Sequence, residues 1–390
     1  MESDRSRKAE NILSHWLSQF RVALVHDWLT GMRGGERVLE AICDLFPHAD
    51  LYTLIHHPGR VSPRIEKMAI RTSVLGRIPG AARHYRLLLP LFPYLIGRFD
   101  LSAYDLIVSV SHAVAKGVKH GARPLHVCYL LTPMRYIWAS YGDYFAPQRA
   151  SPVLRTAARV LRPFLQRWDR RTAQQVDHFI AVSRYVQSQA ERVYGRAATV
   201  VYPPVDLARF SPLGPKANYY LLAGALTPNK RPDQAVAAFT QLGLPLKVAG
   251  SGPGEKRCRR MAGANIEFLG AVSDETMAAL YRGAKALIFP GCDDFGLVPV
   301  EAQASGTPVI ALAAGGALES VTPETGLLYT DPTVEGLAAA VELFERSPLR
   351  FDPSACVANA ARFGAERFKR ELRAQIDRAW ADSGRPRRVP

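Results

Sequence analysis

The stretch Ala286–Leu312, ALIFPGCDDFGLVPVEAQASGTPVIAL, decides the fold. Four apolar residues at 286–289 predict a buried strand that a Pro-Gly pair ends. After an acidic loop, the pattern predicts a short helix over 296–304, terminated by Ser-Gly. A second apolar strand is expected over 307–312. Strand, loop, helix and strand in this order form the repeating unit of a parallel α/β sheet.

Two carboxylates, Asp293 and Glu301, lie on either side of the loop-to-helix junction. Helix N-termini bind phosphate because their first N–H groups are unpaired and carry partial positive charge. A carboxylate in the helix can hold a sugar diol through two hydrogen bonds. Two acids would repel a bare phosphate but suit one that carries sugars on both sides, as in a nucleotide-sugar. The spacing alone leaves a solvated acidic loop and a surface glutamate as an equal alternative.

The letters DDFGLVPVEAQASGTPVIA at 293–311, followed by AAGGALESV at 313–321, resemble the acidic motif of glycosyltransferase family 4. The branch that they resemble most includes mannosyltransferases of O-antigen and exopolysaccharide synthesis. The resemblance implies a retaining enzyme of the GT-B fold, an α/β class with two doubly wound Rossmann-like domains facing a central cleft. It also implies that Asp293 orients the donor sugar and that Glu301 holds the ribose. The family usually has Glu where this chain has Asp293, which keeps the charge and shortens the side chain by one methylene.

A chain of 390 residues is long enough for about two domains with separate cores. We expect an amphipathic helix over 1–20, an acceptor-side domain over 21–205 and a nucleotide-sugar domain over 206–370. The resemblance implies that the helix ending within 371–390 crosses back to the first domain. The last residues of that segment are expected to be disordered.

Five cysteines lie far apart in the sequence and include no CxxC pair. This pattern favours a reducing compartment and argues against a structural metal site. The first residues are charged, and no apolar run approaches the ~18–20 residues that span a bilayer. We therefore expect a cytoplasmic protein with no metal or other cofactor.

The excess positive charge is confined to residues 51–200, which contain 22 basic and 7 acidic residues, whereas the remainder contains 28 of each. Within this half, residues 71–99 and 150–171 mix arginines with large apolar side chains. Such a mixture suits the inner surface of the cell membrane. Helices packed on the domain core are the alternative in both places. A nucleic-acid binder is a further alternative, but no recognisable nucleic-acid module is present, and we do not expect this partner.

In the first half, a predicted strand over 21–25 is followed by a loop with Asp27 and Arg33, and by Gly34 and Gly35 before a predicted helix. Glycines at a helix start let backbone N–H groups approach an anion, although alone they favour a tight turn. The position resembles the glycine-rich first loop of the family. That resemblance implies contact with the donor phosphates, with Asp27 and Arg33 lining the cleft.

Two later segments carry further candidates for the first domain. The resemblance places SHAVAKG, residues 111–117, at the cleft, which implies a catalytic His112 and an acceptor-side Lys116. The letters TPMRY at 132–136 are similar to the mannosyltransferase branch and add Arg135 to the acceptor side. A histidine commonly precedes this threonine in the family, whereas Leu131 cannot form a hydrogen bond.

In the second half, Lys230 and Arg231 stand before a helix expected from about residue 233, which again suits an anion. The resemblance implies that Lys230 neutralises the donor diphosphate, and the family's arginine position is Ala225 here. Gly252 lies in a turn that allows close approach of a nucleotide. The remaining donor-binding residues expected along the acidic motif are Phe295, Gly296, Leu297 and Val298.

The resemblance implies transfer of a hexose, with mannose from GDP-mannose favoured over a UDP-sugar, to a saccharide acceptor that is lipid-linked. The alternative is a degenerate nucleotide-sugar-binding protein, because Leu131, Ala225 and Asp293 depart from the family pattern. Each lost charge-assisted contact costs ~1.5–3 kcal/mol, or roughly ten- to a hundredfold in rate or affinity.

Overall fold

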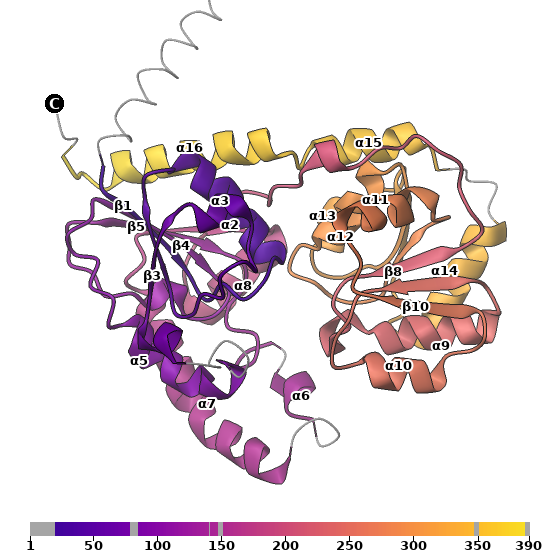
Figure 1. The fold of residues 1–390 in the computed structure, drawn as a ribbon, viewed down its shortest axis with the longest axis horizontal. Helices are drawn as coiled ribbons and strands as arrows, with labels where there is room; N and C mark the ends of the chain where they lie inside the picture. Colours follow the sequence, from indigo (N-terminus) through magenta and orange to yellow (C-terminus); the bar gives the residue numbers. More distant parts are fainter. Residues whose placement is uncertain (1–19, 79–84, 140, 147–150, 347–350, 387–390) are drawn as a thin grey trace, which may run out of the picture. The chain divides into compact units, whose positions relative to one another are not determined.

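The computed structural model describes residues 20–78, 85–139, 141–146, 151–346 and 351–386. The chain divides into two compact units, coloured along the sequence in Figure 1. The first unit holds the residues up to Val182, Val186–Val201 and the chain from Lys369 onward. The second unit holds Ser183–Tyr185 and Tyr202–Phe368. The amphipathic helix expected over 1–20 lies outside the described residues, except for Phe20.

A seven-stranded parallel sheet forms the first unit, in the order β3-β2-β1-β4-β5-β6-β7. Its central strands are buried on both faces, which explains why they read as unbroken apolar runs in the sequence. Two strands were not predicted, because their four-residue sequences, DLYT and AIRT, are short and only partly buried. The strands are β1 (Val22–His26), β2 (Asp50–Thr53), β3 (Ala69–Thr72), β4 (Leu106–Ser111), β5 (Leu125–Leu130), β6 (His178–Ala181) and β7 (Thr199–Val200).

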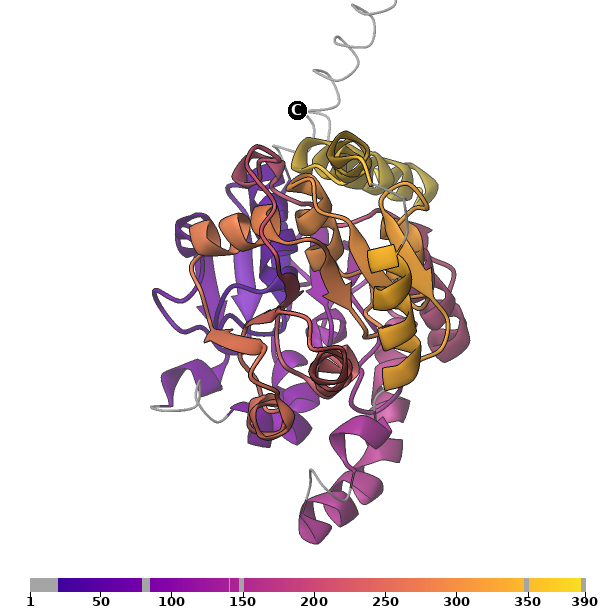
Figure 2. The same cartoon turned by 90° about the vertical axis from the view of Figure 1, so that its right-hand side faces the viewer.

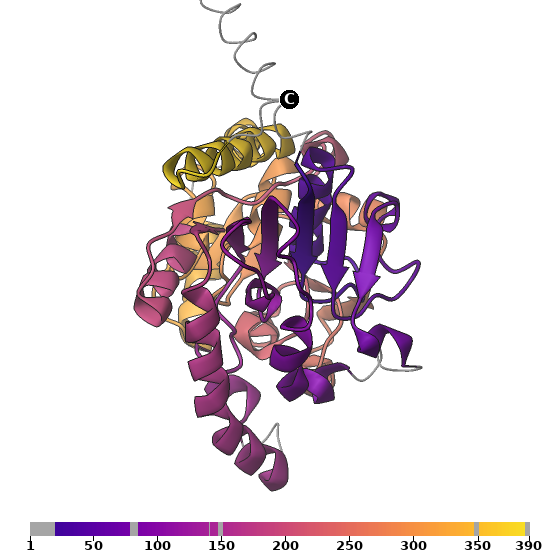
Figure 3. The same ribbon diagram turned by 90° about the vertical axis from the view of Figure 1, so that its left-hand side faces the viewer.

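Helices cover this sheet, and one of them, α7, extends away from it in Figures 1 and 3. The helices are α2 (Gly34–Leu45), α3 (Pro63–Glu66), α5 (Phe92–Ile96), α6 (Tyr141–Tyr144), α7 (Pro152–Ala173), α8 (Arg184–Tyr194) and most of α16 (Ala365–Asp382). Short 3-10 helices are η1 (Val74–Arg77), η2 (Tyr85–Leu91) and η3 (Ala115–Gly117).

The apolar stretch at 71–99 belongs mainly to the core of this unit. Phe92, Leu95 and Ile96 are buried in one hydrophobic cluster with side chains of the sheet and of η3. Leu91 and Tyr94 remain exposed. Part of the described stretch thus packs on the core, while the exposed side chains, which also include Val74 and Ile78, leave the membrane-surface expectation a prediction. Residues 79–84 lie outside the described residues.

The second unit contains a six-stranded parallel sheet in the order β10-β9-β8-β11-β12-β13. Its strands are β8 (Tyr220–Ala223), β9 (Leu246–Ala249), β10 (Ile266–Gly270), β11 (Leu287–Phe289), β12 (Val309–Leu312) and β13 (Gly326–Tyr329). The two doubly wound α/β domains predicted from the sequence are thus confirmed as a fold class. The strand, helix and strand expected from the opening stretch are β11, α12 (Leu297–Ala304) and β12.

Helices lie on both faces of the second sheet (Figures 1 and 2). One face is covered by α9 (Pro232–Leu242), α10 (Glu255–Met261) and α14 (Val334–Arg346), whose apolar side chains join one core cluster. The other helices of this unit are α11 (Asp274–Gly283), α12, α13 (Ala317–Ser320) and α15 (Pro353–Ala361). Ser273 caps α11 by accepting the N–H of Thr276.

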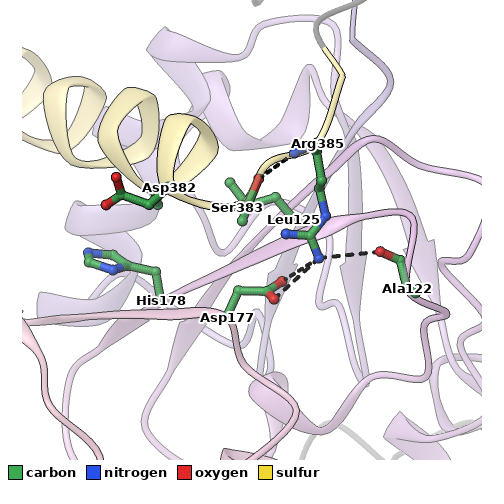
Figure 4. Close-up of a pocket in the computed structure, with 8 residues that line it drawn as sticks. Ala122, Leu125, Asp177, His178, Asp382, Ser383 and Arg385 are labelled. Atoms are coloured by element: carbon green, nitrogen blue, oxygen red, sulfur yellow. Dashed lines mark hydrogen bonds and ion pairs between the residues drawn. The ribbon is translucent and has the colours of Figure 1, made fainter.

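The C-terminal helical part of the chain consists of two helices, α15 and α16, separated by a short break at residues 362–364. The tail after α16 is held to the first unit by Arg385, which donates to the carboxylate of Asp177 and to the carbonyl of Ala122 (Figure 4). The expectation of disorder from residue 383 is therefore wrong for 383–386. Ala122, Asp177 and Arg385 line a pocket at the amino ends of β5 and β6. This is the edge of the first sheet opposite to the one that carries the site residues described below.

Candidate active site

In the first unit, the candidate site is built where β1 and β4 end side by side. Asp27 directly follows β1, and its buried carboxylate accepts the backbone N–H groups of the four residues after β4 at 2.5–3.1 Å. These residues are His112, Ala113, Val114 and Ala115. Hydrogen bonds to a charged acceptor are the strong ones. Asp27 therefore fixes the loop that carries His112. The sequence analysis expected Asp27 to line the cleft, but its carboxylate is fully buried in this loop.

His112 is the exposed member of this group. Its Nδ1 lies 2.9 Å from Oδ2 of Asp27, and 28% of the side chain is accessible. Burial alone would lower the pKa of His112, but the Asp27 carboxylate outweighs burial and raises it. Likewise, burial favours a raised pKa for Asp27, yet the charge of His112 and hydrogen bonds hold that pKa far below its usual range. The Asp27 carboxylate thus lies against the imidazole of His112 and favours its protonated form.

Arg135 lies close enough for its charge to act against protonation of His112, so the structure brings these two predicted residues together. The ring of Trp28 packs edge-on against His112, with centroids 4.5 Å apart. Trp28 was not predicted as a site residue, although its position next to Asp27 was an available signal.

The glycine pair lies at the start of α2, as the sequence suggested. A Cβ on Gly35 would stand 3.0 Å from Cδ1 of Leu131, so the glycine allows these two loops to pack closely. Gly34 is the first residue of α2, and the backbone N–H of Arg33 donates to the Glu36 carboxylate at 3.0 Å. The Arg33 side chain is exposed.

The assignment of Lys116 to the acceptor side is corrected. Its side chain is 1% exposed, and its ammonium forms an ion pair with the fully buried Asp169 of α7. The same carboxylate accepts hydrogen bonds from Nε1 of Trp138 at 2.7 Å and from the hydroxyl of Tyr194 at 2.9 Å. Lys116 thus joins η3 to α7 inside the core and has no access to a ligand.

In the second unit, the predicted pair Lys230 and Asp293 meets at the carboxyl edge of the sheet. Nζ of Lys230 lies 3.3 Å from Oδ2 of Asp293, with 25% and 14% of the two side chains exposed. Lys230 ends the 3-10 helix η5 (Pro228–Lys230) after β8, and Asp293 lies in the loop after β11. Because β8 and β11 are neighbours, the topology brings the two loops together.

Glycines in the loops after neighbouring strands allow these loops to pack closely around the ion pair. A Cβ on Gly224, after β8, would stand 3.4 Å from Nζ of Lys230. A Cβ on Gly291, after β11, would stand 2.5 Å from the Cα of Lys230, and one on Gly315 would stand 2.3 Å from the carbonyl oxygen of Asp293. Bare backbone therefore surrounds the ion pair. The predicted residue Gly252 likewise allows close packing of backbone, since a Cβ added there would stand 2.7 Å from the carbonyl oxygen of Leu226.

The helix after the acidic loop begins at Leu297, preceded by Gly296 with a φ of 81°. Leu297 and Val298 are partly exposed, and their N–H groups belong to the first turn, where no partner exists within the helix. Phe295 is different: it is 3% exposed and packs between Tyr202 and Phe363, so its side chain belongs to the core. The donor-binding expectation for Phe295 is thus limited to its backbone.

Glu301 is held by a residue that the sequence analysis missed. The hydroxyl of Tyr281, on α11, donates to Oε2 of Glu301 at 2.8 Å. Tyr281 is 1% exposed, and burial together with the adjacent carboxylate raises the pKa of its hydroxyl far above the usual value. Tyr281 therefore remains a neutral donor that orients Glu301.

Arg231 does not replace the family arginine missing at Ala225. Its guanidinium donates to the carbonyl of Pro332 at 3.2 Å. It is also the one non-glycine residue with positive φ, 47°, among the described parts of the chain. Ala225 is exposed and carries no charge.

Within the described residues, no group of three or more histidine, cysteine or acidic side chains is placed to hold a metal ion. In the same ranges, no helix is both long and apolar enough to cross a bilayer.

Comparison with known proteins gives the fold of the chain and a sequence family for each half. The fold is that of GT-B glycosyltransferases, and all four of the following solved matches share it only at low identity. Sucrose-phosphate synthase from Thermosynechococcus elongatus superposes with a TM-score of 0.67 at 20% identity, over 93% of this chain and 100% of that one. Three structures of Anabaena HepE, with UDP-glucose, with UDP and glucose, and with UDP, each superpose with a TM-score of 0.66. The UDP-glucose complex is 18% identical over 92% of this chain and 99% of that one.

Residues 32–209 match the sequence family described as Glycosyltransferase Family 4, and residues 206–363 match Glycosyl transferases group 1. The chain therefore belongs to glycosyltransferase family 4. This confirms the family resemblance drawn from the acidic motif.

Curated relatives match over part of their length. A GDP-mannose-dependent monoacylated alpha-(1-6)-phosphatidylinositol monomannoside mannosyltransferase from Corynebacterium glutamicum is 29% identical over 46% of this chain and 56% of its own. A D-inositol 3-phosphate glycosyltransferase from Rhodococcus erythropolis is 32% identical over 45% of this chain and 47% of its own. The chain thus spans about half the length of the curated relatives it matches.

Proposed function

We propose that this protein is a retaining hexosyltransferase that moves mannose from GDP-mannose to a hydroxyl of a lipid-linked saccharide during surface polysaccharide synthesis. The observation that carries the proposal is the Lys230–Asp293 pair, set among bare glycine backbone at the carboxyl edge of the second sheet. In doubly wound α/β folds, ligands bind at this edge. Membership of the family and the GDP-mannose-dependent relative support the choice of reaction and donor.

The chemistry follows from the charges. The bond between the anomeric carbon and the oxygen of the donor phosphate breaks, and a new bond forms between that carbon and the acceptor oxygen. The proton of the acceptor hydroxyl passes to the leaving phosphate oxygen. The leaving nucleoside diphosphate gains negative charge, which the ammonium of Lys230 and the first N–H groups of α12 stabilise. Asp293, positioned by the N–H of Gly316 on its carbonyl at 2.9 Å, orients the sugar. Glu301, oriented by Tyr281, holds the ribose diol.

The first unit is assigned the acceptor side of the reaction. His112, whose protonated form the Asp27 carboxylate favours, has an exposed edge that can donate a hydrogen bond, and the charge of Arg135 acts on it. A cationic donor suits the hydroxyls of a sugar or the phosphate of a lipid-linked acceptor. We place this activity at the inner face of the cell membrane, where such an acceptor is found.

The donor is tested by the thermal unfolding of the purified full-length chain with GDP-mannose, UDP-glucose and ADP-glucose. We expect stabilisation by GDP-mannose above the other two, and its loss in Lys230→Ala. Mass spectrometry of the reaction with a lipid-linked saccharide then detects the added hexose. Stabilisation without transfer or hydrolysis would favour the degenerate binding protein instead, and a flat response to all three donors would contradict both.

A further inference from the structure

The long helix α7 consists of two halves with different surroundings. Its C-terminal half is anchored in the first unit through the buried Asp169 and through Gln166, which donates to the carbonyl of Ile137 at 2.8 Å. Arg162, near the boundary between the halves, donates to the same carbonyl at 3.0 Å. Its N-terminal half extends away from the sheet (Figure 3). From Pro152 to Phe164, every residue except Ala158 and Arg162 is exposed.

The extended half presents an apolar stripe to solvent. Val153, Val160 and Phe164 are 80%, 59% and 71% exposed, and Ala157 lies between them. The spacing of four, seven and eleven residues from Val153 places all of these side chains on one face of a helix. Exposed apolar side chains on a soluble surface are normal one at a time, but a continuous stripe indicates an interaction site.

The charge on this helix identifies the kind of partner. It contains six arginines and one acidic residue, Asp169, which is buried and neutralised by Lys116. Arg155 and Arg159 are exposed and lie on the face opposite the apolar stripe. Thus the exposed surface of the helix combines an apolar face with a polar face that is entirely cationic. A helix with these two faces lies in the interfacial layer of a membrane with anionic lipid.

We propose that residues 152–164 of α7 form a membrane-docking surface for a bilayer containing anionic phospholipid. Val153, Val160 and Phe164 enter the boundary between headgroups and acyl chains, and Arg155 and Arg159 meet the lipid phosphates. This deepens the proposed function, on which it rests for its purpose, because a surface-bound enzyme reaches a lipid-linked acceptor. The exposed Leu91 and Tyr94 belong to the same unit, on η2 and α5.

The test is flotation of the full-length protein with vesicles of phosphatidylcholine, with and without phosphatidylglycerol. We expect binding to the anionic vesicles only, weakened by added salt because the arginine contacts are screened. The double variant V160D/F164D should lose about tenfold or more in vesicle affinity. The matched control is Leu343→Asp on α14 of the second unit. Leu343 is 57% exposed, close to the 59% of Val160.

The charge is tested separately. R155Q/R159Q should lose affinity for anionic vesicles, whereas R259Q/R260Q, with the same charge change on α10, should retain it. Stabilisation of each variant by GDP-mannose reports on the donor site, so a failure of membrane docking is distinguished from a failure of the proposed function. Unchanged binding by V160D/F164D would overturn the proposal. So would a wild-type chain that ignores anionic vesicles, or one that buries the stripe in a dimer detected by light scattering.

Discussion

The carboxyl edges of the two sheets use charged residues in opposite ways. At the first edge, Asp27 and Lys116 are buried and fully engaged by protein partners, and His112 alone of these three reaches solvent. At the second edge, Lys230 and Asp293 remain partly exposed, and glycine backbone surrounds them.

The difference shows what each edge contributes. The first edge uses a buried carboxylate to hold one imidazole in position and to raise its pKa. The second keeps a cation and an anion accessible and removes side chains from around them. The same residue type is therefore buried in a structural ion pair in one unit, as Lys116 is, and left partly exposed for the proposed donor in the other, as Lys230 is.

The largest effect is expected from breaking the buried pair of the first edge. Lys116→Met leaves the Asp169 carboxylate buried with only neutral donors, which costs ~3–5 kcal/mol of the free energy of unfolding. Urea unfolding followed by tryptophan fluorescence measures this. The described tryptophans, Trp28, Trp138, Trp168 and Trp380, all belong to the first unit.

The matched control is Lys119→Met, three positions along the chain. Its ammonium pairs with Asp100 at 3.1 Å, but the lysine side chain is 67% exposed. We expect no measurable change in the urea midpoint for this variant. A Lys116→Met protein as stable as the wild type would remove the distinction drawn between the two edges.

The second prediction concerns the exposed pair. Lys230→Ala should reduce the rate of hexose transfer by about 10²–10³-fold, because the diphosphate loses its cation in the transition state. Stability should change by less than ~1 kcal/mol, since a partly exposed pair contributes little. Steady-state kinetics and thermal unfolding measure the two quantities. The control is Lys247→Ala on β9, which removes the ion-pair partner of Glu267 and should leave the rate of transfer intact. Equal losses of rate in both variants would refute a donor role for Lys230.

The third prediction uses the pH dependence of the first edge. A raised pKa means that protonated His112 stabilises the fold at pH values below its ordinary pKa, and that this contribution is lost as pH rises through the folded pKa. The difference in unfolding free energy between wild type and His112→Gln should therefore be largest near pH ~6 and shrink toward pH ~9.

Proton NMR of the His112 ring gives the pKa directly. Asp27→Asn should lower the pKa of His112. The decline of transfer activity with rising pH should then move to lower pH by the same amount as this pKa. Glu66→Gln is the control, because it removes the carboxylate that lies 3.1 Å from a different histidine, His56. If the His112 titration were the same in Asp27→Asn and wild type, Asp27 would have no role in holding the imidazole.

The sequence predicted the residues of these edges better than their surroundings. Apolar runs placed β1 and β11 correctly, so residues that follow these strands, such as Asp27 and Asp293, could be assigned to the carboxyl edges. The pairing of Lys116 with Asp169 could not be predicted, because 53 residues separate them and only packing of α7 on η3 brings them together. The same holds for Tyr281 and Glu301, which belong to different helices.

Arg231 gives the smallest expected effect and sharpens the contrast with its neighbour Lys230. Its left-handed backbone costs a non-glycine residue roughly 1–2 kcal/mol, a cost that asparagine largely avoids. Arg231→Asn should therefore be about 1 kcal/mol more stable than Arg231→Lys, since both variants lose the guanidinium contact with Pro332. Hydrogen exchange of the α9 amides measures this locally in the second unit. The rate of transfer should stay within about threefold of wild type in both variants, because the guanidinium of Arg231 donates to the backbone carbonyl of Pro332. A loss of rate as large as that of Lys230→Ala would instead place Arg231 at the diphosphate.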